Sequence, residues 1–139
     1  MSGLPQGYEL TDDQTRIDPA AAHAFLTRSY WAEGIALDAV TRAIRNSFCV
    51  AVRHGGEQVG MARVVTDYVS LAYLLDVYVV EAHRGHGLSK AMVAHVQDHP
   101  ELRAVRGWLL RTADAHELYC KLGWKPLSRP ETVMERLAA

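Results

Sequence analysis

The sequence predicts a mixed α/β fold, with a central, mostly antiparallel sheet flanked by helices. Two observations lead to this prediction. Runs rich in β-branched and aromatic residues recur along the chain, and several segments between them repeat apolar residues at helical spacing. The length of 139 residues, of which 49% are hydrophobic, suits one core. We therefore expect residues 1–139 to form a single domain.

The N-terminal part of the chain contains one predicted strand and two predicted helices. The strand is expected within residues 7–17, "GYELTDDQTRI". Asp18 can cap a helix whose first position is Pro19, and this helix should run to about Tyr30. Apolar residues at helical spacing then predict a second, short helix that ends near Asn46.

Three strands in a meander are predicted next. The first is "FCVAVR" (48–53), and a Gly-Gly turn joins it to the second, "QVGMARVVT" (58–66). The third is "AYLLDVYVV" (72–80), which has the composition of a buried strand. A sheet of at least these three strands should therefore form the centre of the fold.

The C-terminal half alternates helix and strand. A helix that begins after Gly87 should end before Pro100, because the residue before a proline disfavours the α conformation. "RGWLLRT" (106–112) reads as a strand. Asp114 then resembles an N-cap, which predicts a short helix over residues 115–122.

The end of the chain is predicted to return to the sheet. Gly123 occupies the position where a left-handed glycine usually ends a helix. Residues 124–127 ("WKPL") and 132–137 ("TVMERL") are expected to be two terminal strands. Their sheet edges offer a route to a dimer, so we expect a monomer or a homodimer.

Composition argues against several classes of protein. Fifteen Lys and Arg against sixteen Asp and Glu leave a charge of −1, so we expect no nucleic-acid partner. The N-terminus lacks a signal pattern and no apolar run approaches ~18 residues, so we expect a cytoplasmic protein without a membrane partner. Cys49 and Cys120 lack ligand spacing, and the seven histidines show no HExxH pattern, so we predict no metal.

An Arg-Gly-His-Gly sequence separates the third strand of the meander from the next helix. Gly85 and Gly87 allow a tight turn whose amides point toward one place, where the positive end of the helix dipole adds to them. Arg84 and Lys90 can add charge-assisted bonds to phosphate oxygens. The stretch predicts an anion cradle, or a glycine-permitted turn alone. It matches neither the P-loop nor the Rossmann pattern.

These residues resemble the GNAT N-acetyltransferase superfamily. Residues 84–89, "RGHGLS", are similar to its Gln/Arg-x-x-Gly-x-Gly/Ala motif, with Ser89 at the last position. Residues 112–124, "TADAHELYCKLGW", resemble a second family segment, in which Thr112 stands where Asn is usual. The resemblance covers nearly the whole chain. It implies a sheet splayed at a cofactor cleft, and acetyl-CoA as the acyl donor with CoA as the product.

The resemblance also implies roles for individual residues. Tyr119 is implied as the general acid that protonates the departing thiolate, and an aromatic on the packed face of a short helix is the alternative. Backbone groups of Val77 and Val79 should contact the acetyl carbonyl and the pantetheine arm, and Thr112 should reach the cofactor. The cradle for the pyrophosphate is implied at Arg84, Gly85, His86, Gly87, Leu88, Ser89 and Lys90.

The general base and the acceptor site are left open by the sequence. The candidates for the base are Asp76, Asp67, His116 and Glu33, each acting directly or through water. Aromatic residues could line an acceptor pocket or a cation–π site, although such residues are more often core. The candidate acceptor residues are Tyr30, Trp31, Asp67, Tyr68, Tyr73 and Asp76.

We therefore predict an acetyl-CoA-dependent N-acetyltransferase, which transfers the acetyl group to a primary amine by direct attack within a ternary complex. The acceptor is a small molecule or a peptide amine. Three alternatives remain: a non-catalytic acyl-CoA-binding or sensor module, an acyltransferase that uses a longer acyl-CoA, and an unrelated phosphopeptide or nucleotide binder.

Overall fold

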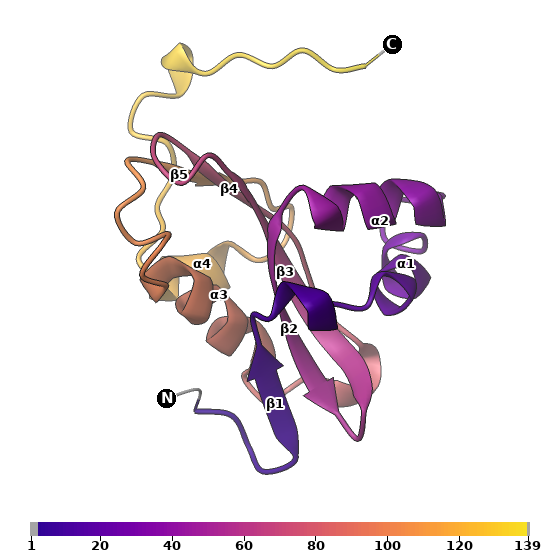
Figure 1. Cartoon of the computed structure of the whole chain (residues 1–139). Coiled ribbons are helices and arrows are strands. Elements are labelled where there is room, and N and C mark those ends of the chain that lie inside the picture. The colour runs from indigo at the N-terminus through magenta and orange to yellow at the C-terminus, as the bar shows by residue number, and fades with distance from the viewer. Residues whose placement is uncertain (1–2, 139) are drawn as a thin grey trace.

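The computed structural model describes residues 3–138 and contains one five-stranded sheet with helices on both faces (Figure 1). The strands lie in the order of the sequence, and only the last pair, β4 with β5, is parallel. The predicted mostly antiparallel, mixed sheet is thereby confirmed. The strands are β1 (Tyr8–Thr11), β2 (Phe48–His54), β3 (Glu57–Thr66), β4 (Ala72–Val79) and β5 (Trp108–Leu110). The α-helices are α1 (Pro19–Leu26), α2 (Leu37–Arg45), α3 (Leu88–Asp98) and α4 (His116–Lys121).

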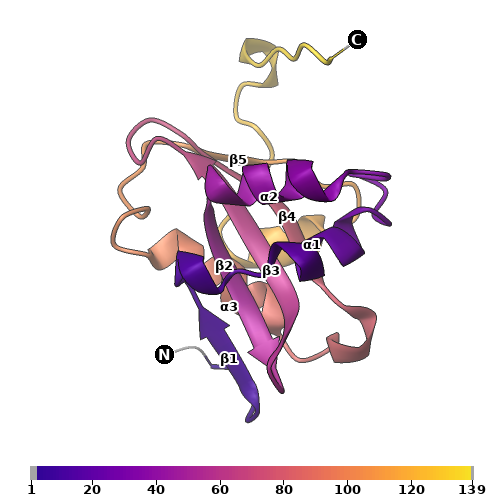
Figure 2. The same cartoon turned by 45° about the vertical axis from the view of Figure 1, so that its right-hand side comes forward.

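Two hydrophobic cores lie on opposite faces of this sheet. α1 and α2 cover one face, and α3 and α4 cover the other (Figures 1 and 2). Alternate residues of a strand point to opposite faces, so Cys49 and Ala51 of β2 join the α1–α2 core while Val50 and Val52 join the α3–α4 core. All four are fully buried. The central strands therefore read as continuous apolar runs.

The first helix starts as predicted and ends earlier than predicted. The Asp18 carboxylate accepts hydrogen bonds from the amides of Ala20 and Ala21, and Pro19 occupies the first turn. The helix ends at Leu26 rather than near Tyr30. The buried hydroxyl of Ser29 donates to the Leu26 carbonyl at 2.7 Å, and the chain then continues in turns. The second helix ends at Arg45, as expected.

The short helix α4 lacks the side-chain cap that was predicted at its start, and its N-cap residue is Ala115. Asp114 makes no cap bond; instead the amide of Ala115 donates to Thr112 Oγ1 at 3.0 Å. At the other end Gly123 adopts φ +95°, and the amide of Trp124 donates to the Tyr119 carbonyl at 3.0 Å. This six-to-one bond is the Schellman arrangement that the glycine predicted.

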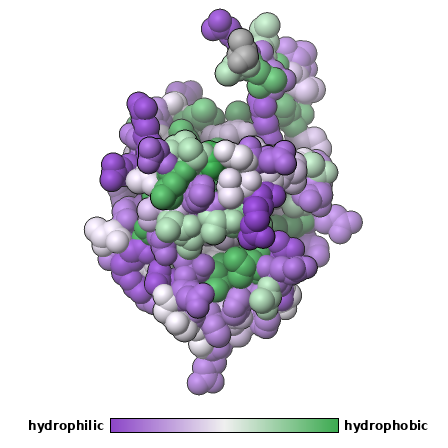
Figure 3. Space-filling view, turned by 90° about the vertical axis from the view of Figure 1, so that its right-hand side faces the viewer, coloured by the Kyte–Doolittle hydropathy of each residue, from purple (hydrophilic) through white to green (hydrophobic). Residues whose placement is uncertain are grey.

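The two predicted terminal strands are wrong for this structure. Residues 124–127 and 132–137 pair with no other strand, and the end of the chain contains only a short 3₁₀ turn, η3 (Pro130–Thr132). Every residue from 125 to 138 is exposed, and the end of the chain, from η3 onward, stands away from the body of the molecule (Figures 1, 2 and 3). Strand propensity alone does not make a strand, because the backbone also needs a partner. The strand predicted at 106–112 is likewise reduced to β5.

The buried thiol of Cys49 should make stability depend on pH. Burial raises its pKa to about 12, whereas an unfolded thiol titrates near ~8.5. Above that unfolded pKa the unfolded chain loses a proton that the native chain keeps, so stability should fall as pH rises. We predict that the free energy of unfolding decreases between pH ~9 and ~11 more steeply in the native chain than in Cys49→Ala. The two slopes should differ by up to about 1.4 kcal/mol per pH unit. Urea unfolding at several pH values measures it.

The matched control is Cys120→Ala, which removes the exposed thiol of α4. Its pH dependence should equal that of the native chain. An unchanged slope in Cys49→Ala would contradict the account.

Candidate functional site

Strand β4 carries one extra residue in its pairing with β3. Met61 pairs with Tyr78 and Arg63 pairs with Leu75, so β4 has two residues between these pairs where β3 has one. Asp76 lies in this bulge with φ +54°, in the left-handed region that non-glycine residues rarely adopt. Such strain persists only where the surrounding structure enforces it, and it is concentrated at functional sites.

The Asp76 carboxylate is held from two sides. Arg63 Nε donates to Oδ2 at 2.9 Å, and Trp31 Nε1 donates to Oδ1 at 2.9 Å. Arg63 also donates to Ser47 Oγ at 3.0 Å. The Arg63 and Asp76 side chains are only 13% and 10% exposed, so each charge depends on the other for compensation. These contacts fix the bulge.

The pairing of β4 with β5 ends where the bulge begins. It covers Ala72 to Leu74, and the rest of β4 has no neighbour on that side among the described residues. A pocket of about 590 Å³ occupies the resulting gap. Its lining residues are Tyr30, Trp31, Tyr73, Leu74, Leu75, Asp76, Val77, Arg111, Thr112, Ala113, Asp114, Ala115 and Tyr119. The splayed sheet expected from the resemblance is thus present.

Tyr119 reaches the pocket from α4. Its side chain is buried and packs edge-on against Trp124. Burial raises the pKa of Tyr119, and the nearby Asp114 and Tyr30 raise it further. The phenol therefore keeps its proton throughout the neutral range and can donate it.

The Arg-Gly-His-Gly loop joins β4 to α3. Gly85 and Gly87 adopt φ +84° and +74°, and a Cβ added at either would meet open space. Among the described residues, the amides of residues 85–90 donate to no acceptor. They surround the N-terminus of α3, which is the arrangement that binds phosphate groups. Arg84 Nε donates to the Val79 carbonyl at 3.0 Å and so ties the loop to the end of β4.

The structure brings together seven of the candidates that the sequence predicted. These are Tyr30, Trp31, Tyr73, Asp76, Val77, Thr112 and Tyr119. Val79 is buried outside the pocket, and His116 lies on a neighbouring groove. Sequence reasoning missed Arg111 and Asp114, which line the pocket beside Thr112. The available signal was the second motif, which Arg111 directly precedes and which contains Asp114.

Two predicted acceptor residues lie outside the pocket. Asp67 and Tyr68 are on the exposed turn between β3 and β4. The Asp67 carboxylate accepts bonds from the Ser70 hydroxyl and from the amides of Val69 and Ser70, and these bonds lower its pKa. Asp67 therefore holds the turn, and we do not assign either residue to the acceptor site. Glu33, a candidate base, does not line the pocket either.

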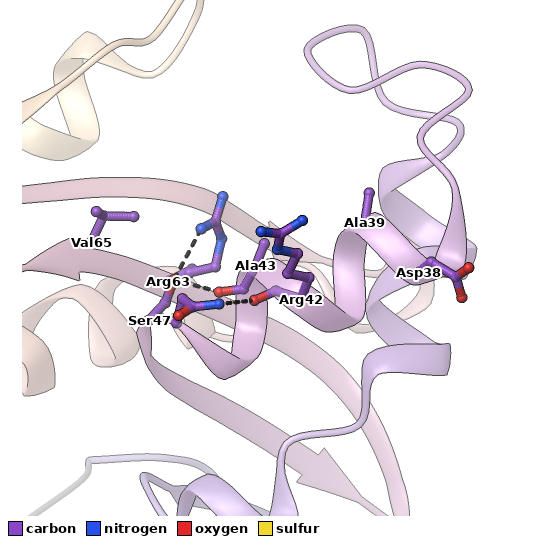
Figure 4. A pocket seen from close by; sticks show the side chains of 8 residues that line it. Asp38, Ala39, Arg42, Ala43, Ser47, Arg63 and Val65 are labelled. Carbon is purple, nitrogen blue, oxygen red and sulfur yellow. Dashed lines mark hydrogen bonds between the residues drawn. The ribbon is translucent and has the colours of Figure 1, made fainter.

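A second hollow, of about 520 Å³, lies beside α2 (Figure 4). Arg63 and Arg42 project into it, and Ser47 lies beneath Arg63. Arg63 thus contacts Ser47 at this hollow and Asp76 at the pocket. Arg63 itself lines the hollow but not the pocket, which it reaches only through Asp76.

Among residues 3–138, no cluster of three or more His, Cys, Asp or Glu side chains is arranged to hold a metal ion. Within the same residues, no helix has the length and apolar character needed to cross a membrane.

The sequence profile of the Acetyltransferase (GNAT) family matches residues 8–124. The chain belongs to the GNAT acetyltransferase family. It is 31% identical over 151 aligned positions to a Gibberella zeae protein described as a putative acetyltransferase, covering 87% of this chain and 84% of that one. A GNAT protein from Xanthomonas campestris pv. campestris has a similar structure, with a TM-score of 0.92, 40% identity and coverage of 97% and 95%.

The GNAT family uses acetyl-CoA as acyl donor, and this chain is accordingly an acetyl-CoA-dependent acetyltransferase. A Clostridium acetobutylicum protein described as a predicted acetyltransferase, whose structure contains acetyl-CoA, shares the fold, with a TM-score of 0.67, 16% identity and 94% coverage of each chain.

The Arg63–Asp76 pair should be strongly coupled. Asp76→Asn keeps a residue that tolerates the left-handed backbone while removing the charge, and it leaves Arg63 uncompensated. We predict that Asp76→Asn lowers the free energy of unfolding by about 3 kcal/mol, and that adding Arg63→Met recovers part of this loss. Urea unfolding of both single variants and the double variant measures the coupling.

The exposed ion pair Arg111–Glu135 is the control. It is tested by the same double-mutant cycle, with Arg111→Met, Glu135→Gln and the double variant. Its coupling should stay below about 1 kcal/mol. Equal coupling in the two cycles would show that the bulge does not depend on Arg63.

Proposed function

We propose that this GNAT enzyme transfers the acetyl group of acetyl-CoA to a primary amine by direct attack, with donor and acceptor bound together. The observation that carries the proposal is the pocket in the β4–β5 gap, which Tyr119 and the bulged strand line together. Its volume of about 590 Å³ is within the range of small-molecule sites.

The donor would bind across the end of β4. When bound, acetyl-CoA supplies an acetyl group activated as a thioester. The amides of residues 85–90 receive its pyrophosphate, and Lys90 adds a positive charge at the first turn of α3. Val77, in the bulge, and Thr112, across the gap, line the path from this loop to Tyr119. The Val79 carbonyl already accepts a hydrogen bond from Arg84, so we do not assign it a contact with the acetyl group or the pantetheine arm.

Tyr119 acts as the general acid in this proposal. It gives its proton to sulfur as the carbon–sulfur bond breaks and the carbon–nitrogen bond forms. A raised pKa suits this role, because the phenol is protonated before each turnover. A cationic acceptor first loses one proton to water in the open side of the pocket, because only the neutral amine can attack. The attacking nitrogen loses its second proton to water as the amide forms, and water returns a proton to the Tyr119 phenolate.

The acceptor end of the pocket suits a cationic amine. Tyr30, Trp31 and Tyr73 present aromatic faces, and Asp76 and Asp114 present carboxylates. Both oxygens of Asp76 already accept a hydrogen bond, from Trp31 and from Arg63. We therefore assign Asp76 a positioning and electrostatic role rather than that of the base.

Two alternatives to the acetyltransferase proposal differ from it in turnover or in the acyl group that is transferred. A sensor module would bind acyl-CoA without turnover, and an enzyme for longer chains would prefer a larger acyl group. Steady-state assays of CoA release with acetyl-CoA and with longer acyl-CoA donors distinguish the proposed acetyltransferase from the sensor module and from the enzyme for longer chains.

Donor binding should depend on the glycine loop. We predict that isothermal titration detects binding of acetyl-CoA, of desulfo-CoA and, more weakly, of adenosine 3′,5′-bisphosphate. Gly87→Glu, alone or with Arg84→Ala, introduces a carboxylate and a strained backbone at the cradle. The dissociation constant for desulfo-CoA should rise at least about tenfold, because one lost charge-assisted bond is worth about 1.5 kcal/mol.

Gly55→Glu is the matched control. Gly55 also has a positive φ, +58°, and open space at its Cβ, but it lies in the β2–β3 turn. Its affinity should equal that of the native chain. Equal weakening by both variants, or no binding by the native chain, would contradict the assignment of the cradle.

Replacing Tyr119 by Phe should slow chemistry without weakening donor binding. The variant keeps the ring packed on Trp124 and removes the proton donor. We predict a decrease in kcat of about 100-fold, with KM for acetyl-CoA changed by less than about threefold. CoA release with a panel of primary amines measures it.

Tyr68→Phe removes an exposed phenol outside the pocket and should leave kcat unchanged. A Tyr119→Phe enzyme with native kcat would exclude the phenol as general acid.

A further inference from the structure

The hollow beside α2 contains two arginines that face the same space. Arg42 comes from α2 and Arg63 from β3, and Figure 4 shows both guanidinium groups turned to the same side. Ser47 lies beneath Arg63 and accepts a hydrogen bond from its Nη1. Two positive charges that share one hollow attract an anion.

Both arginines keep donors for such an anion. Among residues 3–138, the Arg42 side chain has no hydrogen bond and no ion pair, and Nη2 of Arg63 has no acceptor. Asp38 also lines the hollow, one turn before Arg42 on the same helix, but it forms no ion pair with either arginine. Planar guanidinium groups bind carboxylates through two parallel hydrogen bonds. The hollow therefore has the donors of a carboxylate site.

The hollow adjoins the acceptor end of the pocket in the β4–β5 gap. Arg63 lines the hollow and pairs across the β3–β4 ladder with Leu75, which lines the pocket. Val65 in the hollow and Tyr73 in the pocket form a second such pair. Directly paired residues of an antiparallel ladder share one face of the sheet. The hollow and the acceptor end therefore lie side by side on the face that α1 and α2 cover.

Apolar surface connects these two regions. Val65 is 43% exposed although it lies in a strand, and Tyr73 beside it is half-buried. A methylene chain or an extended peptide has room to pack on this pair. Neighbouring strands lie ~4.8 Å apart, so a ligand that runs from the gap beside β4 to the arginines over β3 crosses one to two strand spacings, ~5–10 Å.

We propose that the acceptor carries a carboxylate, which Arg42 and Arg63 bind in the hollow while the amine of the acceptor lies in the pocket near Tyr119. This inference rests on the proposed acetyl transfer and names its substrate class, an amino carboxylate whose two charged groups are ~5–10 Å apart. An ω-amino acid or a short peptide has this spacing, because two residues of extended chain span ~7 Å. The two groups of an α-amino acid share one carbon atom and are too close.

The carboxylate takes no part in the chemistry. The amine nitrogen forms the new bond to the acetyl carbon, the carbon–sulfur bond breaks, and the products are an N-acetylamino carboxylate and CoA. Asp76 and Asp114 at one end of the site and the arginines at the other match the opposite charges of such an acceptor. Arg63 keeps its bond to Asp76 through Nε, so the bulge is unchanged. Arg42 is therefore a specificity-determining residue.

Two pairs of acceptors test the proposal, and the members of each pair differ only in the carboxylate. They are 6-aminohexanoate with 6-aminohexanamide, and glycylglycine with glycylglycinamide. We expect kcat/KM for CoA release to be at least about tenfold higher for the carboxylate in one or both pairs, because the amide cannot form the charge-assisted bonds. The pair with the larger preference distinguishes an ω-amino acid from a peptide as the acceptor.

Arg42→Met should bring the two values of kcat/KM within about threefold of each other, because it removes the guanidinium and keeps an unbranched side chain. Arg45→Met is the matched control. Arg45 is exposed in the last turn of the same helix but outside the hollow, and its replacement should leave the preference intact. Equal values for carboxylate and amide in both pairs would overturn the inference and leave acetyl transfer standing. A preference that survives Arg42→Met would also overturn it.

Binding of the products tests the carboxylate site without turnover. Amide NMR during titration with 6-acetamidohexanoate or N-acetylglycylglycine should show shifts at Ser47 and Val65 in the native chain and in Arg45→Met, but not in Arg42→Met. Such shifts in a chain that releases no CoA with any of the four amines would contradict the proposed transfer and support the carboxylate site. A native chain whose hollow shifts with neither product would overturn the carboxylate site, whatever its turnover.

Discussion

The strained residue Asp76 in the β4 bulge is the constraint on which the candidate site depends. Its left-handed backbone inserts one extra residue opposite β3, and Arg63 and Trp31 hold its carboxylate in place. Those two partners come from β3 and from the turns after α1, so three distant segments converge on one carboxylate. The bulge in turn coincides with the point where β4 loses β5 as a neighbour. The pocket lies in the gap that opens at this point.

The gap in the sheet connects two chemically different regions. At one end the loop amides and the N-terminus of α3 favour negative charge, and at the other the pocket carries carboxylates and aromatic rings. Tyr119 lines this pocket and is buried enough to keep its proton. This polarity is what the proposed transfer from an anionic donor to an amine would require. Burial on α4, with Trp124 packed against the ring, raises the pKa of Tyr119.

The sequence predicted the fold, the turn at the glycine loop and the short helix α4, because local patterns encode them: the loop in its two glycines and the end of α4 in Gly123. The role of Tyr119 came from the family resemblance and stays a prediction. Sequence reasoning missed the contact between Trp31 and Asp76, which are 45 residues apart and joined only by tertiary structure. It also could not foresee the positive φ of Asp76, since that conformation usually calls for glycine. The terminal strands failed for a third reason. Strand propensity can be judged from a short segment, but whether another strand is available to pair with that segment depends on the whole fold.

The most direct test of this account is amide NMR mapping of the native chain during titration with desulfo-CoA. The account predicts that the largest shifts occur at Gly85 and Gly87 in the loop and at Val77 in the bulge, with Arg42 beside α2 unaffected. Such a result would place the donor across the end of β4 and into the gap. Shifts confined to the hollow beside α2 would contradict the central claim, since the ligand would then bind where neither the loop nor Tyr119 can reach it.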